Sequence, residues 1–160
     1  MKKIAIVFIV LFSSLFTKEY VNLLSIGAGG FDIFKDRNRT WQLHIDYKPS
    51  IHYWKIRPMV GIMMTKKGSI YTFSGIVFDF ILKDMCFVTP SFSAGYYYQG
   101  DGKDLGYPLE FKSGIEIGYR FKDKSRIGLN FYHLSNASIR KRNPGEESLI
   151  LFYSIPFVPK

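Results

Sequence analysis

The fold is decided by stretches such as residues 125–136, which read SRIGLNFYHLSN. In an extended chain, successive side chains point to opposite faces, so residues of one parity share a surface. The odd positions of this stretch are Ile127, Leu129, Phe131, His133 and Ser135. We therefore predict a strand whose apolar face also carries His133 and Ser135, with their Cα atoms about 6.6 Å apart.

The run that follows the turn-forming residues 143–145 alternates in the same way. Its odd positions are Glu147, Leu149, Leu151, Tyr153, Ile155 and Phe157. An antiparallel pairing that sets His133 opposite Glu147 gives one continuous apolar face, on which opposed Cβ atoms are about 4.5–5.5 Å apart. Glu147 would then hold the ring of His133 while Ser135 lies on its other side. This arrangement is that of a catalytic triad, which consists of a nucleophile, a base and a group that orients the base.

A plain explanation of the same three residues stays open, in which they are incidental. Any chain of this length contains Ser, His and Glu, and a histidine near a strand end is usually a surface residue. Their position favours the chemical interpretation. An unpaired polar group on an apolar face costs several kcal/mol, and mutual hydrogen bonds would offset that cost.

Eight runs from residue 20 onward have the two-residue period of strands, and none has a convincing helical period. Their limits are 20–33, 39–48, 52–64, 69–81, 85–98, 108–121, 125–136 and 146–157. Turn-forming residues separate them. In the third run Trp54, Ile56 and Val60 share the apolar face, and Pro90 suggests a bulge or a break in the fifth. The sequence predicts an all-β protein with eight antiparallel strands.

Parity alone does not distinguish a soluble barrel from a transmembrane one, but three features favour a transmembrane barrel of the outer-membrane type. Lys2 and Lys3 are basic and residues 4–16 are mostly apolar, as in a secretory signal. The strand-like runs are about 11–14 residues long, enough for the roughly 9–11 residues that a tilted strand needs. Aromatic residues cluster near strand ends, where interfacial girdles lie.

These features divide the chain into two segments. Residues 1–18 are predicted to be a signal peptide, although the cleavage site is poorly defined, and residues 19–160 a single barrel domain. The alternative is an uncleaved anchor. We expect a multi-pass β-barrel in the bacterial outer membrane.

The composition limits the partners and cofactors. The 160 residues carry a formal net charge of +9 and are 18% aromatic, which points to an anionic partner such as a phosphate-bearing membrane surface. Nucleic acid fits poorly with an export signal and alternating strands. The single cysteine, Cys86, excludes an internal disulfide and a multi-cysteine metal site. We expect no metal and no cofactor, with His44 and His52 as ordinary barrel or interface residues.

The motif at the end of the quoted stretch resembles that of a known family. A His-x-Ser-Asn-Ala run is followed by a short loop with Asn and Gly, and then by Glu fourteen positions after the His. This is similar to lipid A 3-O-deacylases of the PagL type, eight-stranded barrels that remove the ester-linked 3-position acyl chain of lipid A. The resemblance implies His133 as base, Ser135 as nucleophile and Glu147 as orienting acid, with an oxyanion role for Asn136. Glu146 is adjacent to Glu147, and spacing and parity favour the second.

The basic residues gather in loops that follow the odd-numbered strands, which run outward if the N-terminus is periplasmic. These residues are Lys35, Arg37, Arg39, Lys66, Lys67, Lys103, Arg140, Lys141 and Arg142. We hypothesise that Arg140, Lys141 and Arg142 hold the phosphates of a lipopolysaccharide backbone at the membrane surface. The alternative is a solvated loop tip that only aids solubility.

The sequence thus predicts an esterase whose partners are its lipid A or lipopolysaccharide substrate and outer-membrane lipids, with a homodimer left open. Two other functions remain. One is a non-enzymatic small outer-membrane barrel, structural or adhesive, and the other is a secreted lipid-binding barrel with an apolar lumen.

Overall fold

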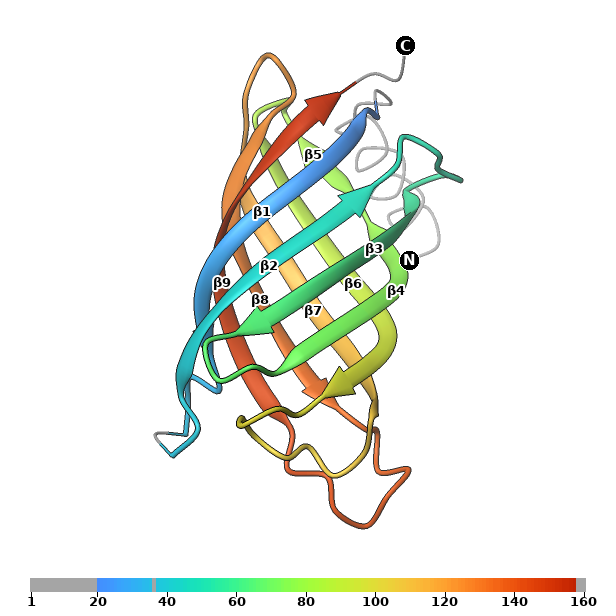
Figure 1. The fold of residues 1–160 in the computed structure, drawn as a ribbon. Coiled ribbons are helices and arrows are strands. Elements are labelled where there is room, and N and C mark those ends of the chain that lie inside the picture. The colour runs from blue at the N-terminus through green and yellow to red at the C-terminus, as the bar shows by residue number, and fades with distance from the viewer. Residues whose placement is uncertain (1–19, 36, 158–160) are drawn as a thin grey trace, which may run out of the picture.

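The computed structural model describes residues 20–35 and 37–157, which form the barrel drawn in Figure 1. The strands are β1 (Asn22–Phe31), β2 (Thr40–Lys48), β3 (Ile56–Thr65), β4 (Ile70–Phe78), β5 (Phe80–Leu82), β6 (Cys86–Tyr98), β7 (Leu109–Arg120), β8 (Arg126–Ser135) and β9 (Glu146–Phe157). Across the described ranges, no helix has the length and hydropathy needed to cross a membrane. The predicted signal segment, residues 1–18, lies outside the described residues.

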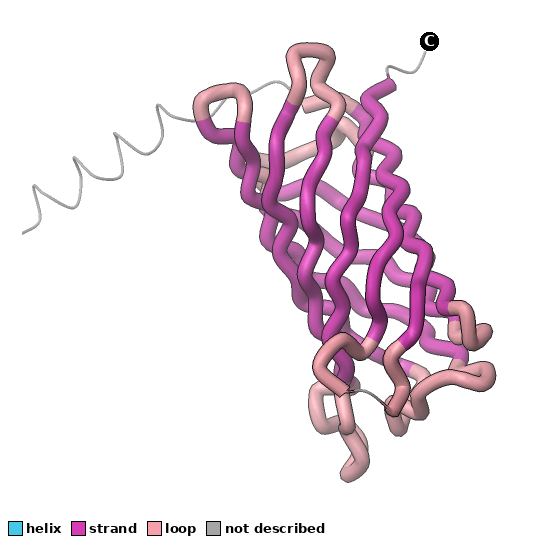
Figure 2. The backbone as a smooth tube through the Cα atoms, turned by 90° about the vertical axis from the view of Figure 1, so that its left-hand side faces the viewer, coloured by secondary structure: helices cyan, strands magenta, loops and turns pink. Residues whose placement is uncertain are grey.

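The sheet closes on itself. β1 lies between β2 and β9, with Ile26 facing Ile45 on one side and Tyr153 on the other. β4 and β5 both pair with β6 and together make one interrupted barrel strand. The result is the eight-stranded antiparallel barrel seen from two sides in Figures 1 and 2, which confirms the predicted fold class.

The interruption between β4 and β5 is at Asp79, one residue from the position that faces Pro90. Val77 pairs with Ser91 and Phe80 with Val88, so the register is the same on both sides of the gap and would set Phe78 opposite Pro90. Proline has no N–H to donate to a ladder. The sequence predicted a break at Pro90 in its own strand. The break is instead in the neighbouring strand, at nearly the same level along the barrel, and β6 continues through Pro90.

The third strand begins later than predicted. β3 starts at Ile56, and the residues before it form a turn in which Tyr53 and Ile56 exchange backbone hydrogen bonds of 3.0 Å. Trp54 has a φ of 55° there and is 68% exposed. Its predicted place on the apolar face of the strand is wrong, because this left-handed backbone conformation ends the two-residue alternation.

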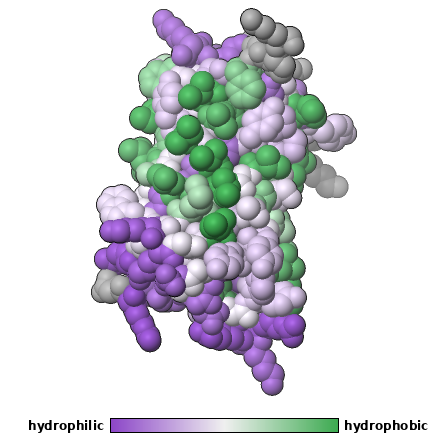
Figure 3. Space-filling view, viewed as in Figure 1, coloured by the Kyte–Doolittle hydropathy of each residue, from purple (hydrophilic) through white to green (hydrophobic). Residues whose placement is uncertain are grey.

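The alternation of side chains gives the barrel an apolar outside and a polar inside. Ile127 and Leu129 of β8 and Leu151 of β9 are exposed, whereas Asn130 and Ser148 are buried in the lumen. Figure 3 shows hydrophobic side chains across the middle of one face and hydrophilic ones gathered toward its ends. An apolar outer band around a polar interior is the pattern of a transmembrane barrel.

Charged side chains lie in the lumen beside buried apolar ones, and several of them pair there. At one end the carboxylate of Asp79, which is 0% exposed, accepts hydrogen bonds from Arg57 at 2.7 Å and from Arg126 at 2.8 and 2.9 Å. Thr89 donates a further bond of 3.0 Å. Arg57 also donates to backbone carbonyls of the segment before β1 and of the β2–β3 turn, so this cluster ties several strands together.

The two ends of the barrel differ. The two longest connections, residues 99–108 and 136–145, lie at the lower end in Figure 1, while the connections β2–β3, β5–β6 and β7–β8 lie at the upper end. In outer-membrane barrels the longer loops face the outside of the cell and the short turns face the periplasm. The end that carries residues 136–145 is therefore the outward one.

We expect Asp79→Ala to destabilise the barrel by about 3–5 kcal/mol, since it leaves two buried guanidinium groups without their counter-charge. Urea unfolding of detergent-solubilised protein measures the difference. Asp101→Ala, which removes an exposed carboxylate from the β6–β7 loop, is the control and should unfold like the unmodified protein. Equal stability of the two variants would show that the cluster contributes nothing to the fold.

Candidate active site

The predicted cross-strand register is present at the outward end of the barrel. His133 of β8 is opposite Glu147 of β9, and Phe131 is opposite Leu149. The imidazole Nδ1 of His133 lies 3.1 Å from Oε1 of Glu147, and the two side chains are 41% and 25% exposed on the outer wall. A carboxylate at this distance fixes the ring's orientation and favours the tautomer with its proton on Nδ1.

Ser135 lies on the same outer face, two residues beyond His133, where it pairs with Phe111 of β7. Because Nδ1 of the imidazole contacts Glu147, Nε2 is the nitrogen that can accept a proton from a serine. In the described part of the chain no hydrogen bond joins the Ser135 hydroxyl to this ring. Catalytic hydrogen bonds are often long or poorly aligned without substrate and tighten in the substrate complex.

A second serine, which the sequence reasoning missed, faces His133 from the other side. Ser113 of β7 is directly opposite His133 in the β7–β8 ladder and is exposed. Ser113, His133 and Glu147 therefore form a row across three strands. The signal that could have found Ser113 is the register of β7 against β8, which the turn at residues 121–125 sets. The motif resemblance favours Ser135 over Ser113.

The two adjacent glutamates differ in the direction of their side chains. Glu146 is 0% exposed and points into the lumen, where its Oε2 accepts hydrogen bonds from Ser148 at 2.8 Å and from the backbone N–H of Asp32 at 3.2 Å. Glu147 points outward to His133. Of the two, Glu147 is the one that can orient the imidazole.

Gly145 packs against the ring of His133. A Cβ atom at this position would lie 2.8 Å from Cε1 and 3.3 Å from Nε2 of the imidazole, and the backbone φ is 57°. Both the left-handed conformation and the close approach require glycine. The sequence reasoning identified residues 143–145 only as a turn, so the role of Gly145 as one side of the histidine's pocket was missed.

Asn136 holds loops together at this end of the barrel. Its side chain is buried and Nδ2 donates to the carbonyls of Leu105 at 3.2 Å and Arg142 at 2.9 Å, while its backbone N–H donates to Oδ1 of Asn143 at 3.0 Å. The oxyanion role of Asn136 stays a prediction, and it requires that one of these bonds be exchanged for a bond to substrate.

The three basic residues of the β8–β9 loop have different surroundings. Arg142 donates to Asp104 of the β6–β7 loop at 2.5 Å, and the guanidinium of Arg140 lies 4.9 Å from the ring centre of Tyr107. Lys141 is exposed, and its ammonium has no partner among the residues that the structure describes. The β6–β7 and β8–β9 loops therefore contact each other through the two arginines. Of the three basic residues, Lys141 is the one whose charge contacts no other described residue.

Apolar side chains lie on the outer surface at this end of the barrel. The rings of Phe34 and Phe131 lie 6.3 Å apart at their centres, and Phe34 and Ile139 are 69% and 51% exposed. The backbone N–H of Ile33 donates to the carbonyl of Glu147 at 2.9 Å, which docks the β1–β2 loop beside the site. The site thus opens on a surface suited to acyl chains.

The other two histidines lie apart from this site. His44 is buried in the lumen, edge-on to Phe73 and Tyr132 at 5.4 and 5.8 Å, and Nδ1 of His52 bonds the carbonyl of Ser50 in the β2–β3 turn at 2.9 Å. Within residues 20–35 and 37–157, no group of three or more His, Cys, Asp or Glu side chains is placed to hold a metal ion.

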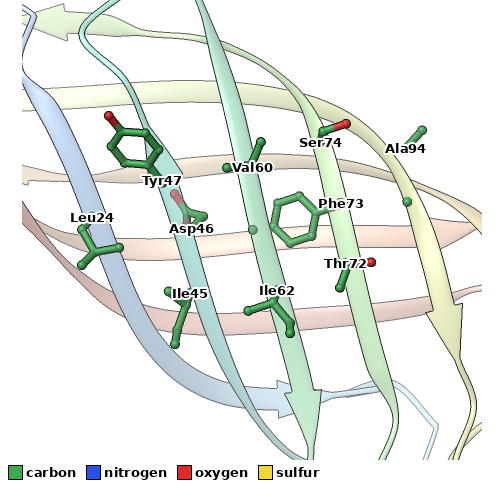
Figure 4. Close-up of a pocket in the computed structure, with 12 residues that line it drawn as sticks. Leu24, Ile45, Asp46, Tyr47, Val60, Ile62, Thr72, Phe73, Ser74 and Ala94 are labelled. Atoms are coloured by element: carbon green, nitrogen blue, oxygen red, sulfur yellow. The ribbon is translucent and has the colours of Figure 1, made fainter.

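A groove of about 560 Å³ crosses the outer wall on another side of the barrel (Figure 4). Leu24, Ile45, Val60, Ile62 and Ala94 contribute to its lining. It runs over β1 to β4 and β6, and none of the predicted site residues borders it. The groove therefore provides no part of the catalytic arrangement.

Comparison with known proteins adds independent findings. Residues 27–156 match the family model of lipid A 3-O-deacylase (PagL). The lipid A deacylase PagL of Pseudomonas aeruginosa is 39% identical over 54 residues, and that of Bordetella bronchiseptica is 36% identical over 55 residues. Each alignment covers 34% of this chain and 31% of the relative, so it spans less than a third of the relative's length.

Solved structures agree with the fold. A crystal structure of the outer-membrane enzyme PagL superposes with a TM-score of 0.66 at 22% identity, covering 84% of this chain and 99% of that one. A de novo designed transmembrane β-barrel superposes with a TM-score of 0.58 at 11% identity, over 89% of this chain and 100% of the design. The barrel is therefore of the outer-membrane type, and because the family model matches most of its length, the chain belongs to the lipid A 3-O-deacylase (PagL) family.

Proposed function

We propose that this protein is a serine esterase of the bacterial outer membrane that hydrolyses the ester-linked 3-position acyl chain of lipid A. The observation that carries the proposal is the contact of 3.1 Å between His133 and Glu147 on the lipid-facing wall, with Ser135 two residues away on the same face. In this assignment Ser135 is the nucleophile, His133 the base and Glu147 the group that orients the base. The family membership and the names of the curated relatives support the same substrate.

The chemistry proceeds in two acyl-transfer steps. His133 takes the hydroxyl proton of Ser135 as its oxygen forms a bond to the ester carbonyl carbon, and the imidazolium returns that proton to the sugar oxygen as the ester bond breaks. A water molecule, deprotonated by the same imidazole, then attacks the acyl-enzyme. The second step releases a free fatty acid and restores the serine.

The position of the site on the barrel matches the geometry of the substrate. Acyl chains would lie in the hydrocarbon layer along the apolar wall, and the phosphorylated sugars would lie at the level of the outward loops. Lys141 is the first candidate to meet a phosphate, because Arg140 and Arg142 already contact Tyr107 and Asp104. Arg140 and Arg142 both contact the β6–β7 loop. Each would form a charge-assisted hydrogen bond with a phosphate if it exchanged its present contact for the substrate. Association of two copies stays a prediction.

We expect Ser135→Ala to lower the release of fatty acid from purified lipopolysaccharide by at least about 10³-fold, because no other group in the scheme forms the acyl-enzyme. Mass spectrometry of the lipid A would show loss of one hydroxyacyl chain with the unmodified enzyme and none with the variant. Ser74→Ala, on the outer wall away from the site, is the control.

Ser113→Ala tests the competing assignment in the same assay. We expect it to keep substantial activity, since the motif places the nucleophile at residue 135. An inactive Ser113→Ala beside an active Ser135→Ala would move the nucleophile to β7. Full activity in both variants would show that neither serine is the nucleophile, and no activity in the unmodified protein would leave a non-enzymatic barrel.

Replacing Arg140, Lys141 and Arg142 together by Gln should raise KM for lipopolysaccharide much more than it lowers kcat, because phosphate contacts made equally in the ground and transition states affect binding alone. Steady-state kinetics on the same substrate measures both constants. Lys122→Gln, an exposed lysine at the opposite end of the barrel, should change neither. Unchanged kinetics in the triple variant would remove the phosphate-binding role.

A further inference from the structure

The His133–Glu147 pair on the outer wall is flanked on the inner wall by two cross-strand pairs. Tyr132 is opposite Ser148, and Leu134 is opposite Glu146. All four inward side chains are at most 1% exposed. The two residues that adjoin Glu147 in the chain, Glu146 and Ser148, therefore both point into the lumen, directly behind the residues of the site.

These inward side chains belong to one chain of hydrogen bonds. The Tyr132 hydroxyl donates to Oε1 of Gln42 at 2.6 Å, and Nε2 of Gln42 donates to the Ser148 hydroxyl at 2.6 Å. The Ser148 hydroxyl donates in turn to Oε2 of Glu146 at 2.8 Å. Each side chain donates to the next one, from Tyr132 to Gln42 to Ser148, and the last acceptor is the side chain of Glu146. It crosses the lumen from β8 through β2 to β9.

The chain is fixed to other parts of the barrel at Glu146 and at Gln42. Oε2 of Glu146 also accepts the backbone N–H of Asp32 at 3.2 Å, and the carboxylate of Asp32 pairs with Lys103 of the β6–β7 loop at 2.7 Å. Gln42 donates a second bond to the carbonyl of Gly30 at 3.0 Å. In a buried setting such bonds are stronger than in water and specify one arrangement of the groups.

We propose that the Tyr132–Gln42–Ser148–Glu146 chain is a positioning device that acts on the catalytic pair through the barrel wall. The proposal rests on the function proposed above. Glu147 and His133 lie on a lipid-facing surface where a single side-chain contact joins them. The buried bonds of residues 146 and 148 fix the backbone on both sides of Glu147, so its carboxylate stays directed at the imidazole. Orientation of this kind contributes directly to rate.

The alternative is that these bonds only stabilise the barrel, as other lumenal bonds do. β9 provides its own comparison, because Ser154 has the same side chain, points into the same lumen and is also buried. Its hydroxyl lies 2.8 Å from that of Ser25. Ser154 is seven residues from Glu147, which corresponds to roughly 23 Å along a strand. A bond that merely holds β9 in place should matter equally at both serines.

The test compares Ser148→Ala with Ser154→Ala in detergent-solubilised full-length protein. We expect Ser148→Ala to lower kcat for fatty-acid release on the order of 10- to 100-fold with KM unchanged, and Ser154→Ala to leave both constants unchanged. Unfolding in urea should give similar losses of stability for the two. Equal kinetic effects of the two substitutions would overturn the proposal. Ser135→Ala in the same preparation reports separately on the proposed function.

A second arm asks whether the network acts through Glu147. In a Glu147→Ala background, Ser148→Ala should produce no further loss of kcat, because the group that it positions is gone. Glu146→Gln keeps an oxygen that accepts the bond from Ser148 and should retain most of kcat, whereas Glu146→Leu should not. A loss for Ser148→Ala that is the same with and without Glu147 would assign the network to stability alone.

Discussion

Everything in this structure follows from the fact that a hydrocarbon layer offers no hydrogen-bond partners to the backbone. A sheet that crosses such a layer must pair every strand on both sides, and it can do so only by closing. Closure divides each strand into residues that face lipid and residues that face the lumen. The division places Leu129 and Leu151 outside and Asp79 and Arg57 inside, and it also determines where a reactive side chain can meet a lipid.

The same division explains which parts of the structure could be predicted from the sequence. Alternation and turn residues were sufficient for the eight barrel strands. Parity put His133 and Glu147 on one apolar face, and the antiparallel register that keeps this face continuous set them opposite each other. The rule fails where the backbone leaves the extended conformation, as at Trp54, or where one strand lacks a donor and its neighbour is interrupted, as opposite Pro90. Ser113 was missed because it reaches the site through the register of another strand pair, which local patterns do not specify.

The contacts between loops could not be predicted from the sequence. The bonds from Asn136 to the carbonyl of Leu105, and from Arg142 to Asp104, join segments about 30 or more residues apart, and no periodicity relates them. The motif resemblance covers the strand-borne residues and the loop that follows, but it gave no indication that the β6–β7 loop packs against them. The site is therefore a product of strands and loops, of which the strands and the β8–β9 loop could be predicted from the sequence and the packing of the other loops could not.

In the proposed function, the His133–Glu147 pair faces the bilayer and meets its substrate in two dimensions. No channel has to admit the lipid and no pocket has to empty, because both substrate and product can arrive and depart by lateral diffusion past Phe34 and Phe131. The concentration that governs such a hydrolase is the mole fraction of substrate in the surrounding leaflet rather than its amount per volume. Diluting that leaflet with inert lipid would slow turnover even when the total amount of substrate stays the same.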